Sequence, residues 1–190
     1  YVNSWININA NVYSNWFRNK IEGMWSNDQT ELHYVNIGKS RLAGVETMCK
    51  IQINRHINVH GAYNYLYTSK DADGVRLSSS SPHSGNIRAE YNTRIPRYAT
   101  VVNLSGNIMG KKKFDVLDEL EIDGKKVEAY YQAKVNPYCL WDLTVSQYIM
   151  QNLRITAGIT NLFDYTSDRV TFNTSTSPGR NYFIACNYTL

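Results

Sequence analysis

Hydrophobic and polar residues alternate along most of the chain, which is the pattern of β-strands with two different faces. At the start, apolar residues at positions 6, 8, 10 and 12 alternate with Trp5, Asn7, Asn9 and Asn11. No segment keeps a helical period. The pattern therefore predicts an all-β protein.

Turn signals divide this pattern into eight expected strands. Within the second strand, Gly38 and Gly44 predict a bulge or a bend. The expected strands are the first residues to Trp25, then 31–54, 57–67, 86–93, 98–109, 138–149, 153–163 and 181–190.

The connections between these strands alternate in length. Those near 55, 95 and 151 are about 2–5 residues long, as in hairpins, whereas those near 28, 76, 123 and 172 are mostly longer. Residues 68–85 read as a long polar loop, and Asp123-Gly124 predicts a solvated hairpin within 110–137. Short turns alternating with long loops are typical of an antiparallel transmembrane β-barrel.

Composition separates a membrane barrel from a soluble protein only in part. The 190 residues suffice for one domain, the mean hydropathy is −0.44, and no apolar run reaches the length of a membrane-spanning helix. Fifteen Tyr, 4 Trp and 5 Phe fit aromatic girdles, and asparagines inside strands fit a wet lumen. A Tyr-rich soluble β-sandwich, such as a carbohydrate-binding module, is the alternative.

The remaining chemistry argues against several function classes. The net charge of +4 is scattered, which disfavours nucleic acid as a partner. Cys49, Cys139 and Cys186 have no metal-ligand spacing, so neither a metal nor a cofactor is expected. No nucleotide-binding, hydrolase or zinc-protease motif occurs. The chain is therefore not expected to be an enzyme.

Three motifs carry a family resemblance. Near the end, Asn161, Leu162, Phe163 and Asp164 precede a loop, then Pro178, Gly179 and Arg180 precede a last alternating strand. Upstream stand "YVNIGKSRLAGVE" (34–46) and "LWDLTVS" (140–146). In this order the motifs strongly resemble the C-terminal part of TonB-dependent outer-membrane receptors, of the siderophore, haem and cobalamin type.

The resemblance implies a fold and partners. Family members form a 22-stranded barrel around an N-terminal plug, so residues 1–190 are expected to supply about eight strands of that barrel, without the plug. The implied location is the bacterial outer membrane, and the implied partners are its lipid, a small ligand such as a metal chelate, and the TonB complex acting through the plug. Family members usually end in Phe, whereas Leu190 stands here.

Candidate ligand-binding residues lie in the predicted outer loops. They are His83, Tyr130, Tyr131, Tyr165 and Arg169. The alternatives are a solvated histidine and aromatic side chains that belong to the girdle or to loop packing. The run "GKKK" (110–113) is either a solvated loop or a site for an anionic ligand or lipid phosphate.

Two further functions stay open at this point. One is a self-contained eight-stranded outer-membrane protein with a structural or adhesive role, and the other is the soluble sandwich. The apolar positions discriminate, because a sandwich buries them in one core whereas a barrel turns them outward. These positions are Ile6, Ile8, Val45, Ile51, Ile87, Ile155, Ile159 and Ile184.

Overall fold

The computed structural model describes residues 5–26, 30–69, 81–122, 125–150, 152–167 and 178–189. All regular structure in these ranges is β-strand, and none of their residues forms a helix able to cross a membrane. The strands are β1 (Ile6–Trp25), β2 (Leu32–Gln52), β3 (Ile57–Thr68), β4 (His83–Asn92), β5 (Thr100–Met109), β6 (Lys112–Ile122), β7 (Lys125–Val135), β8 (Tyr138–Ile149), β9 (Leu153–Thr160) and β10 (Asn181–Tyr188).

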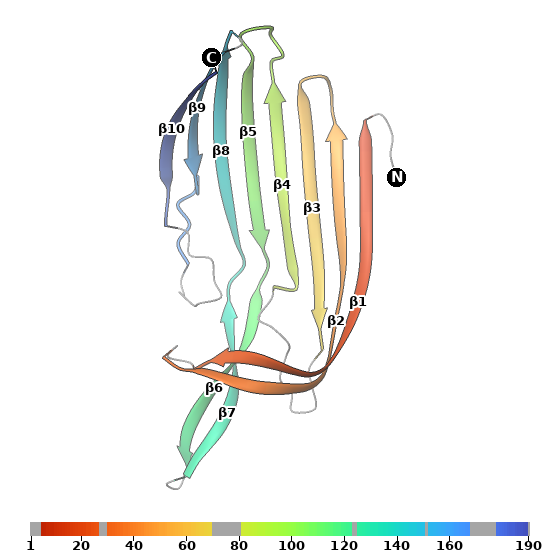
Figure 1. Cartoon of the computed structure of the whole chain (residues 1–190), viewed down its shortest axis with the longest axis vertical. Coiled ribbons are helices and arrows are strands. Elements are labelled where there is room, and N and C mark those ends of the chain that lie inside the picture. The colour runs from red at the N-terminus through yellow and green to blue at the C-terminus, as the bar shows by residue number, and fades with distance from the viewer. Residues whose placement is uncertain are drawn as a thin grey trace.

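Eight strands form one antiparallel sheet in the order β1-β2-β3-β4-β5-β8-β9-β10 (Figure 1). The ribbon β6-β7 is inserted between β5 and β8 and extends beyond the sheet. The sheet is open, with β1 at one edge and β10 at the other. The predicted all-β, antiparallel barrel wall of about eight strands is confirmed, whereas a closed eight-stranded barrel is not what the chain forms.

Short and long connections lie at opposite ends of the sheet, as predicted (Figure 1). At the short end, the Asn54 carboxamide oxygen accepts hydrogen bonds from the backbone N–H of His56 (2.8 Å) and Ile57 (2.9 Å). This Asx turn reverses the chain between β2 and β3. The other two short turns use the left-handed backbone region at Arg94, Arg97 and Met150.

The two faces of the sheet differ in polarity, and the strand register shows it directly. One row across the polar face joins Asn7, Lys50, His60, Arg88 and Ser105. The neighbouring row on the apolar face joins Ile6, Ile51, Val59, Ala89, Leu104, Leu143, Ile159 and Tyr182.

The apolar face does not pack into a core. Ile8, Ile87 and Ile184 are 39%, 37% and 79% exposed, and among the residues whose burial the structure describes Val135 is the one buried hydrophobic residue. A sandwich would have hidden these side chains against a second sheet. The soluble-sandwich alternative is therefore wrong, because the apolar positions face outward as they do in a barrel.

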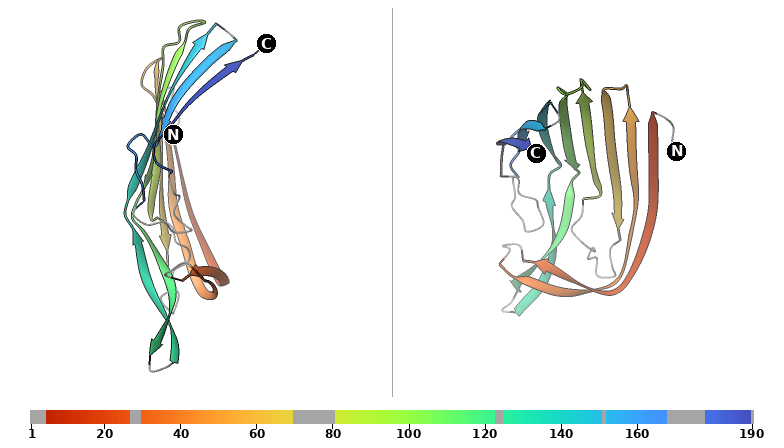
Figure 2. Two further views of the ribbon diagram at one scale, coloured as in Figure 1. Left: turned by 90° about the vertical axis from the view of Figure 1, so that its left-hand side faces the viewer. Right: turned by 45° about the horizontal axis from the view of Figure 1, so that its top comes forward.

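The predicted bulge in the second strand is absent, but the predicted bend is present. Pairing between β1 and β2 keeps one register from Ile6–Ile51 to Trp25–Leu32, so neither strand carries an extra residue. Both strands bend, and their far ends sweep across the sheet, where β1 contacts β6 (Figures 1 and 2).

Gly44 lies in β2 and is buried. A Cβ on Gly44 would come within 2.5 Å of the Tyr13 hydroxyl and 2.6 Å of the Tyr65 backbone oxygen. Glycine is needed here because the neighbouring strands and the phenol approach the backbone closely.

Two strand assignments differ in detail from the expectation. β4 begins at His83, inside the segment predicted as loop, because His83 continues the pairing of β3 with β4 opposite Tyr65. The charged segment forms the hairpin β6-β7, as its turn signal predicted. The tip of that hairpin, Asp123-Gly124, lies outside the described residues.

Candidate functional site

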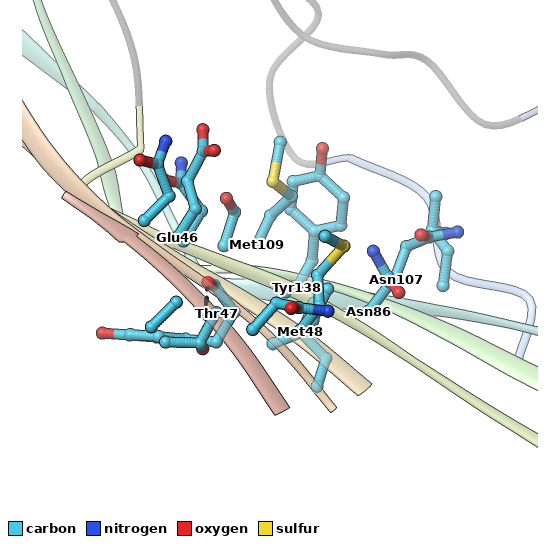
Figure 3. A pocket seen from close by; sticks show the side chains of 17 residues that line it. Glu46, Thr47, Met48, Asn86, Asn107, Met109 and Tyr138 are labelled. Atoms are coloured by element: carbon cyan, nitrogen blue, oxygen red, sulfur yellow. Dashed lines mark hydrogen bonds between the residues drawn. The ribbon is translucent and has the colours of Figure 1, made fainter. Parts of the chain in front are cut away.

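A cavity of about 650 Å³ is hollowed in the polar face, toward the end with the long connections (Figure 3). Its lining is unusually rich in carboxamides. Because each carboxamide offers two donors and an acceptor, this wall can bind a ligand of mixed polarity through many hydrogen bonds. The lining asparagines are Asn9, Asn11, Asn64, Asn86 and Asn107.

Strand register explains why these asparagines gather. Asn86 in β4 pairs with Asn107 in β5, and the same row passes through Met48 and Ala62 to Asn9. Alternate residues of a strand point to one face. The asparagines of four separate strands, β1, β3, β4 and β5, thus form one continuous surface.

The other side chains of the cavity add apolar contact and one negative charge. Met48 and Met109 bring flexible thioethers, Tyr138 brings an aromatic ring, and Glu46 is an exposed carboxylate. Figure 3 shows Met48, Tyr138, Asn86 and Asn107 projecting from the same side of the ribbon. Such a mixture of apolar surface and a few polar groups is typical of small-molecule sites.

One polar atom of this wall has no partner. Among the described residues, the Asn64 carboxamide oxygen and the Ser40 hydroxyl are buried without a hydrogen bond. An unsatisfied buried acceptor is destabilising. A ligand or neighbouring segment that donates a hydrogen bond to Asn64 would remove that penalty.

Charged side chains of the polar face are held in place beside the cavity. The Nη2 and Nε groups of Arg88 donate to the Asn103 carboxamide oxygen at 2.9 and 3.2 Å. The Glu90 carboxylate lies 3.7 Å from the same guanidinium. Both partners are solvent-accessible, so this pair orients Arg88 more than it stabilises the sheet.

The motif residue Asn161 ends β9 and organises the following turn. It is 4% exposed and has a left-handed backbone, with φ 50°. Its carboxamide binds both backbone groups of Tyr165, and its own N–H donates to an Asp142 carboxylate oxygen at 2.9 Å. The Leu162 N–H donates to the Trp141 carbonyl at 2.6 Å. The "WD" pair of β8 thus anchors this motif.

The second segment of the motif, residues 178–180, is hydrogen-bonded to the first segment, residues 161–164. An Asp164 carboxylate oxygen accepts the Arg180 backbone N–H at 2.7 Å, which fixes the start of β10. Gly179 has φ 85°. A hydrogen bond with the Tyr182 side chain raises the pKa of the exposed Arg180 guanidinium above its ordinary value. These contacts assign the motif a structural role at the last hairpin.

A family model described as "TonB dependent receptor-like, beta-barrel" matches residues 1–162. The chain belongs to the TonB-dependent receptor family. The match includes Asn161 and Leu162, whereas Gly179 and Arg180 lie beyond it. Members of this family are transporters of the bacterial outer membrane.

Solved structures of two receptors and a transporter share this fold at low sequence identity. The siderophore receptor PirA from Acinetobacter baumannii matches with a TM-score of 0.72 and 16% identity, over 99% of this chain and 30% of its own. A mutant of the ferric enterobactin receptor PfeA from Pseudomonas aeruginosa gives 0.71 and 17%, over 99% and 29%. The copper transporter OprC gives 0.71 and 14%, over 100% and 30%. This chain therefore covers less than a third of the length of each of these three proteins.

The structure separates two of the predicted ligand residues. Tyr165 stacks on Tyr138 of the cavity lining, with ring centroids 5.0 Å apart and planes 7° from parallel. His83 lies instead on the apolar face, where its Nδ1 is 2.7 Å from the Tyr63 hydroxyl and its ring is 5.2 Å from that of Tyr65. His83 therefore joins an aromatic cluster with Tyr63 and Tyr65 and is itself absent from the cavity lining.

The other predicted ligand residues are not placed at side-chain level. Tyr130 and Tyr131 belong to β7, pairing with Leu117 and Val116, and their side chains fall outside the description. Arg169 lies outside the described residues, as does Leu190.

Sequence reasoning missed the cavity residues themselves. A signal was present, because the asparagines alternate with apolar residues in neighbouring strands.

Within the described ranges, no group of three or more His, Cys, Asp or Glu side chains is arranged to hold a metal ion.

Proposed function

We propose that the chain is part of the barrel wall of an outer-membrane receptor that imports a scarce nutrient. The nutrient class is an iron–siderophore, haem or cobalamin, and TonB supplies the energy through a plug encoded elsewhere in the protein. Membership of the TonB-dependent receptor family supports this proposal. It is also supported by the fold shared with a siderophore receptor and a ferric enterobactin receptor.

The observation that carries the ligand-binding part is the carboxamide-rich cavity on the polar face. In a barrel the polar face lines the lumen, so a nutrient that passes through meets these side chains. Metal chelates and cobalamin present many carbonyl, amide and hydroxyl groups, which match a wall of asparagines with tyrosine beside them. The earlier candidates His83, Tyr130, Tyr131, Tyr165 and Arg169 stay predictions.

The test is uptake by intact cells that express the complete gene. Radiolabelled ferric enterobactin, haem and cobalamin are supplied separately, in strains with and without TonB. We expect one of them to accumulate only when both the receptor and TonB are present. Equal accumulation in the strain that lacks TonB would contradict the energy source, and no receptor-dependent uptake of any compound would contradict the nutrient class.

A second experiment tests the cavity. The double variant Asn86→Leu/Asn107→Leu removes two carboxamides from the lining. The matched control is Asn58→Leu/Asn187→Leu, which changes two asparagines of the polar face outside the cavity. We expect the first variant to weaken ligand binding at least ten-fold, by the loss of about two hydrogen bonds, with little change in the control. An equal effect in both would refute the cavity as the binding wall.

The self-contained structural barrel is the weaker candidate. Its eight strands would have to close, yet β1 and β10 stand at opposite edges of an open sheet. We therefore propose that residues 1–190 form one continuous part of a larger barrel. Cross-linking β1 and β10 cysteine pairs in the complete protein tests this, because a rapid β1–β10 cross-link would favour the small barrel.

A further inference from the structure

A row of basic side chains crosses the polar face of the sheet directly beside the cavity. Lys50 in β2 pairs with His60 in β3, and His60 pairs in turn with Arg88 in β4. All three residues are exposed, and none of them belongs to the cavity lining. We call Lys50, His60 and Arg88 the basic row.

Strand register fixes the position of the basic row relative to the cavity. Each of its members follows or precedes a cavity residue by two positions along its own strand, and those cavity residues are Met48, Ala62 and Asn86. Two residues span roughly 7 Å of a strand and return to the same face. A ligand that fills the cavity therefore has the basic row within reach of a short side arm.

Charge is distributed unevenly along this part of the wall. The Glu46 carboxylate lies two residues from Met48 toward the long connections, whereas Lys50 lies two residues from Met48 toward the short connections. The cavity thus has a negative group on one side and the basic row on the other. A ligand with acid groups at one end would be bound in a single orientation.

The basic row lacks compensating charge. Cationic side chains placed directly opposite each other on paired strands repel, and His60 stands between Lys50 and Arg88. Within the described part of the chain, neither the Lys50 ammonium nor the His60 ring makes an ion pair or a side-chain hydrogen bond. An arrangement that opposes folding without a compensating contact is expected at a functional site.

Arg88 differs from the other two members because its guanidinium is already bound. It contacts Asn103 and Glu90, which pair with each other in the next row away from the cavity. Lys50 and His60 are therefore the groups free to meet a ligand. An ammonium offers three N–H donors and an imidazole at least one, and hydrogen bonds from such groups to ionised oxygens are stronger than neutral ones.

We propose that the basic row binds the acid groups of the nutrient while the rest of the nutrient occupies the cavity. The inference rests on the function proposed above and narrows it to chelates that carry ionised carboxylate or phenolate groups, such as haem or ferric enterobactin. Cobalamin, whose peripheral side chains are amides, would leave the ammonium of Lys50 without a partner and is selected against.

Uptake by cells that express the complete receptor separates this inference from the function on which it rests. We expect haem or ferric enterobactin to accumulate in a manner that depends on the receptor and on TonB, and cobalamin not to. Receptor-dependent accumulation of cobalamin would overturn the role of the basic row and leave the importer function standing. No receptor-dependent accumulation of any of the three compounds would overturn both.

A binding experiment tests the residues themselves. The complete protein, purified in detergent, is titrated with haem and with ferric enterobactin. We expect the variant Lys50→Gln/His60→Gln to bind the acidic ligand at least ten-fold more weakly, because hydrogen bonds to charged groups are lost. Lys50→Arg, which keeps the charge, should bind nearly as well as the unchanged protein. The matched control is Arg94→Gln/Arg97→Gln, which removes two exposed cations from a short turn and should bind normally.

Four results of the titrations would contradict the inference. They are an unchanged affinity in Lys50→Gln/His60→Gln, an equal loss in the control, an equal loss in Lys50→Arg, and an affinity of the unchanged protein that does not fall as salt is added. The salt series keeps the inference testable without any variant, because the attraction between exposed charges is screened by salt. The Gln variant should fold at least as well as the unchanged protein, since it removes a repulsion.

Discussion

The Asn161 side chain binds both backbone polar groups of Tyr165: its oxygen accepts the Tyr165 N–H at 2.8 Å, and its Nδ2 donates to the Tyr165 carbonyl at 2.7 Å. One buried carboxamide therefore replaces a backbone ladder where β9 has ended. Tyr165 in turn stacks on Tyr138 beside the cavity. The motif that reveals the family also positions an aromatic side chain at the proposed ligand wall.

Replacing Asn161 by Ala is expected to destabilise the folded barrel by about 2–4 kcal/mol. The change removes two side-chain hydrogen bonds and leaves a less tolerant residue in the left-handed region. Urea titration of the complete protein in micelles, followed by tryptophan fluorescence, measures the effect.

The control for this variant is Asn187→Ala. Asn187 is an exposed asparagine of the neighbouring strand β10, on the polar face. We expect its replacement to change the free energy of unfolding by no more than about 0.5 kcal/mol. Similar losses of stability in the two variants would mean that the hydrogen bonds from Asn161 to Tyr165 add no stability of their own.

Gly179→Ala is expected to destabilise the start of β10 by about 1–2 kcal/mol. Alanine disfavours the observed φ of 85°, and its Cβ would lie 3.2 Å from the Asp164 carboxylate that holds the Arg180 N–H. Hydrogen exchange of the β10 amides should accelerate. Gly61→Ala serves as the control, because a Cβ there meets no atom within 4 Å. Equal acceleration in both variants would contradict this account.

Gly158→Ala tests an aromatic cover on the polar face. The Phe183 ring lies directly over Gly158, its partner in the β9–β10 ladder. An added Cβ displaces that ring, so we expect a loss of about 1 kcal/mol in a urea titration. In a Phe183→Ala background the same substitution should be nearly neutral, since no ring remains to be displaced. A loss of the same size in both backgrounds would rule out the ring as its cause.

Alternating residues made the strands, their order and the position of the long connections predictable. The apolar residues from Ile6 to Val12 alternate with asparagines because the two faces of this sheet meet different solvents. The same alternation of apolar and polar residues recurs in the other strands of the sheet. The hairpin β6-β7 was predictable from Asp123-Gly124 for a similar reason, since turn chemistry is local.

Features that depend on contacts across strands were not predictable. Gly38 and Gly44 were expected to mark a bulge or a bend, and the strands do bend. The close contact of the Tyr13 phenol with Gly44, in an unbroken register, was not foreseen. His83 was expected in a loop near the ligand, but pairing with Tyr65 turns it to the apolar face. The cavity follows from sheet curvature, which single-strand patterns do not encode.

The assignment of the two faces can be tested at neighbouring residues of β10. Ile184 lies on the apolar face between Tyr182 and Tyr188, whereas Ala185 lies on the polar face opposite Thr156. In a bilayer, Ile184→Arg puts a cation into hydrocarbon and is expected to cost about 2–4 kcal/mol, while Ala185→Arg reaches the wet lumen at little cost. Refolding yield and urea stability of the complete protein in phosphatidylcholine vesicles measure both. If Ala185→Arg proves the more damaging change, the polar face is not the lumen and the proposed nutrient cavity fails with it.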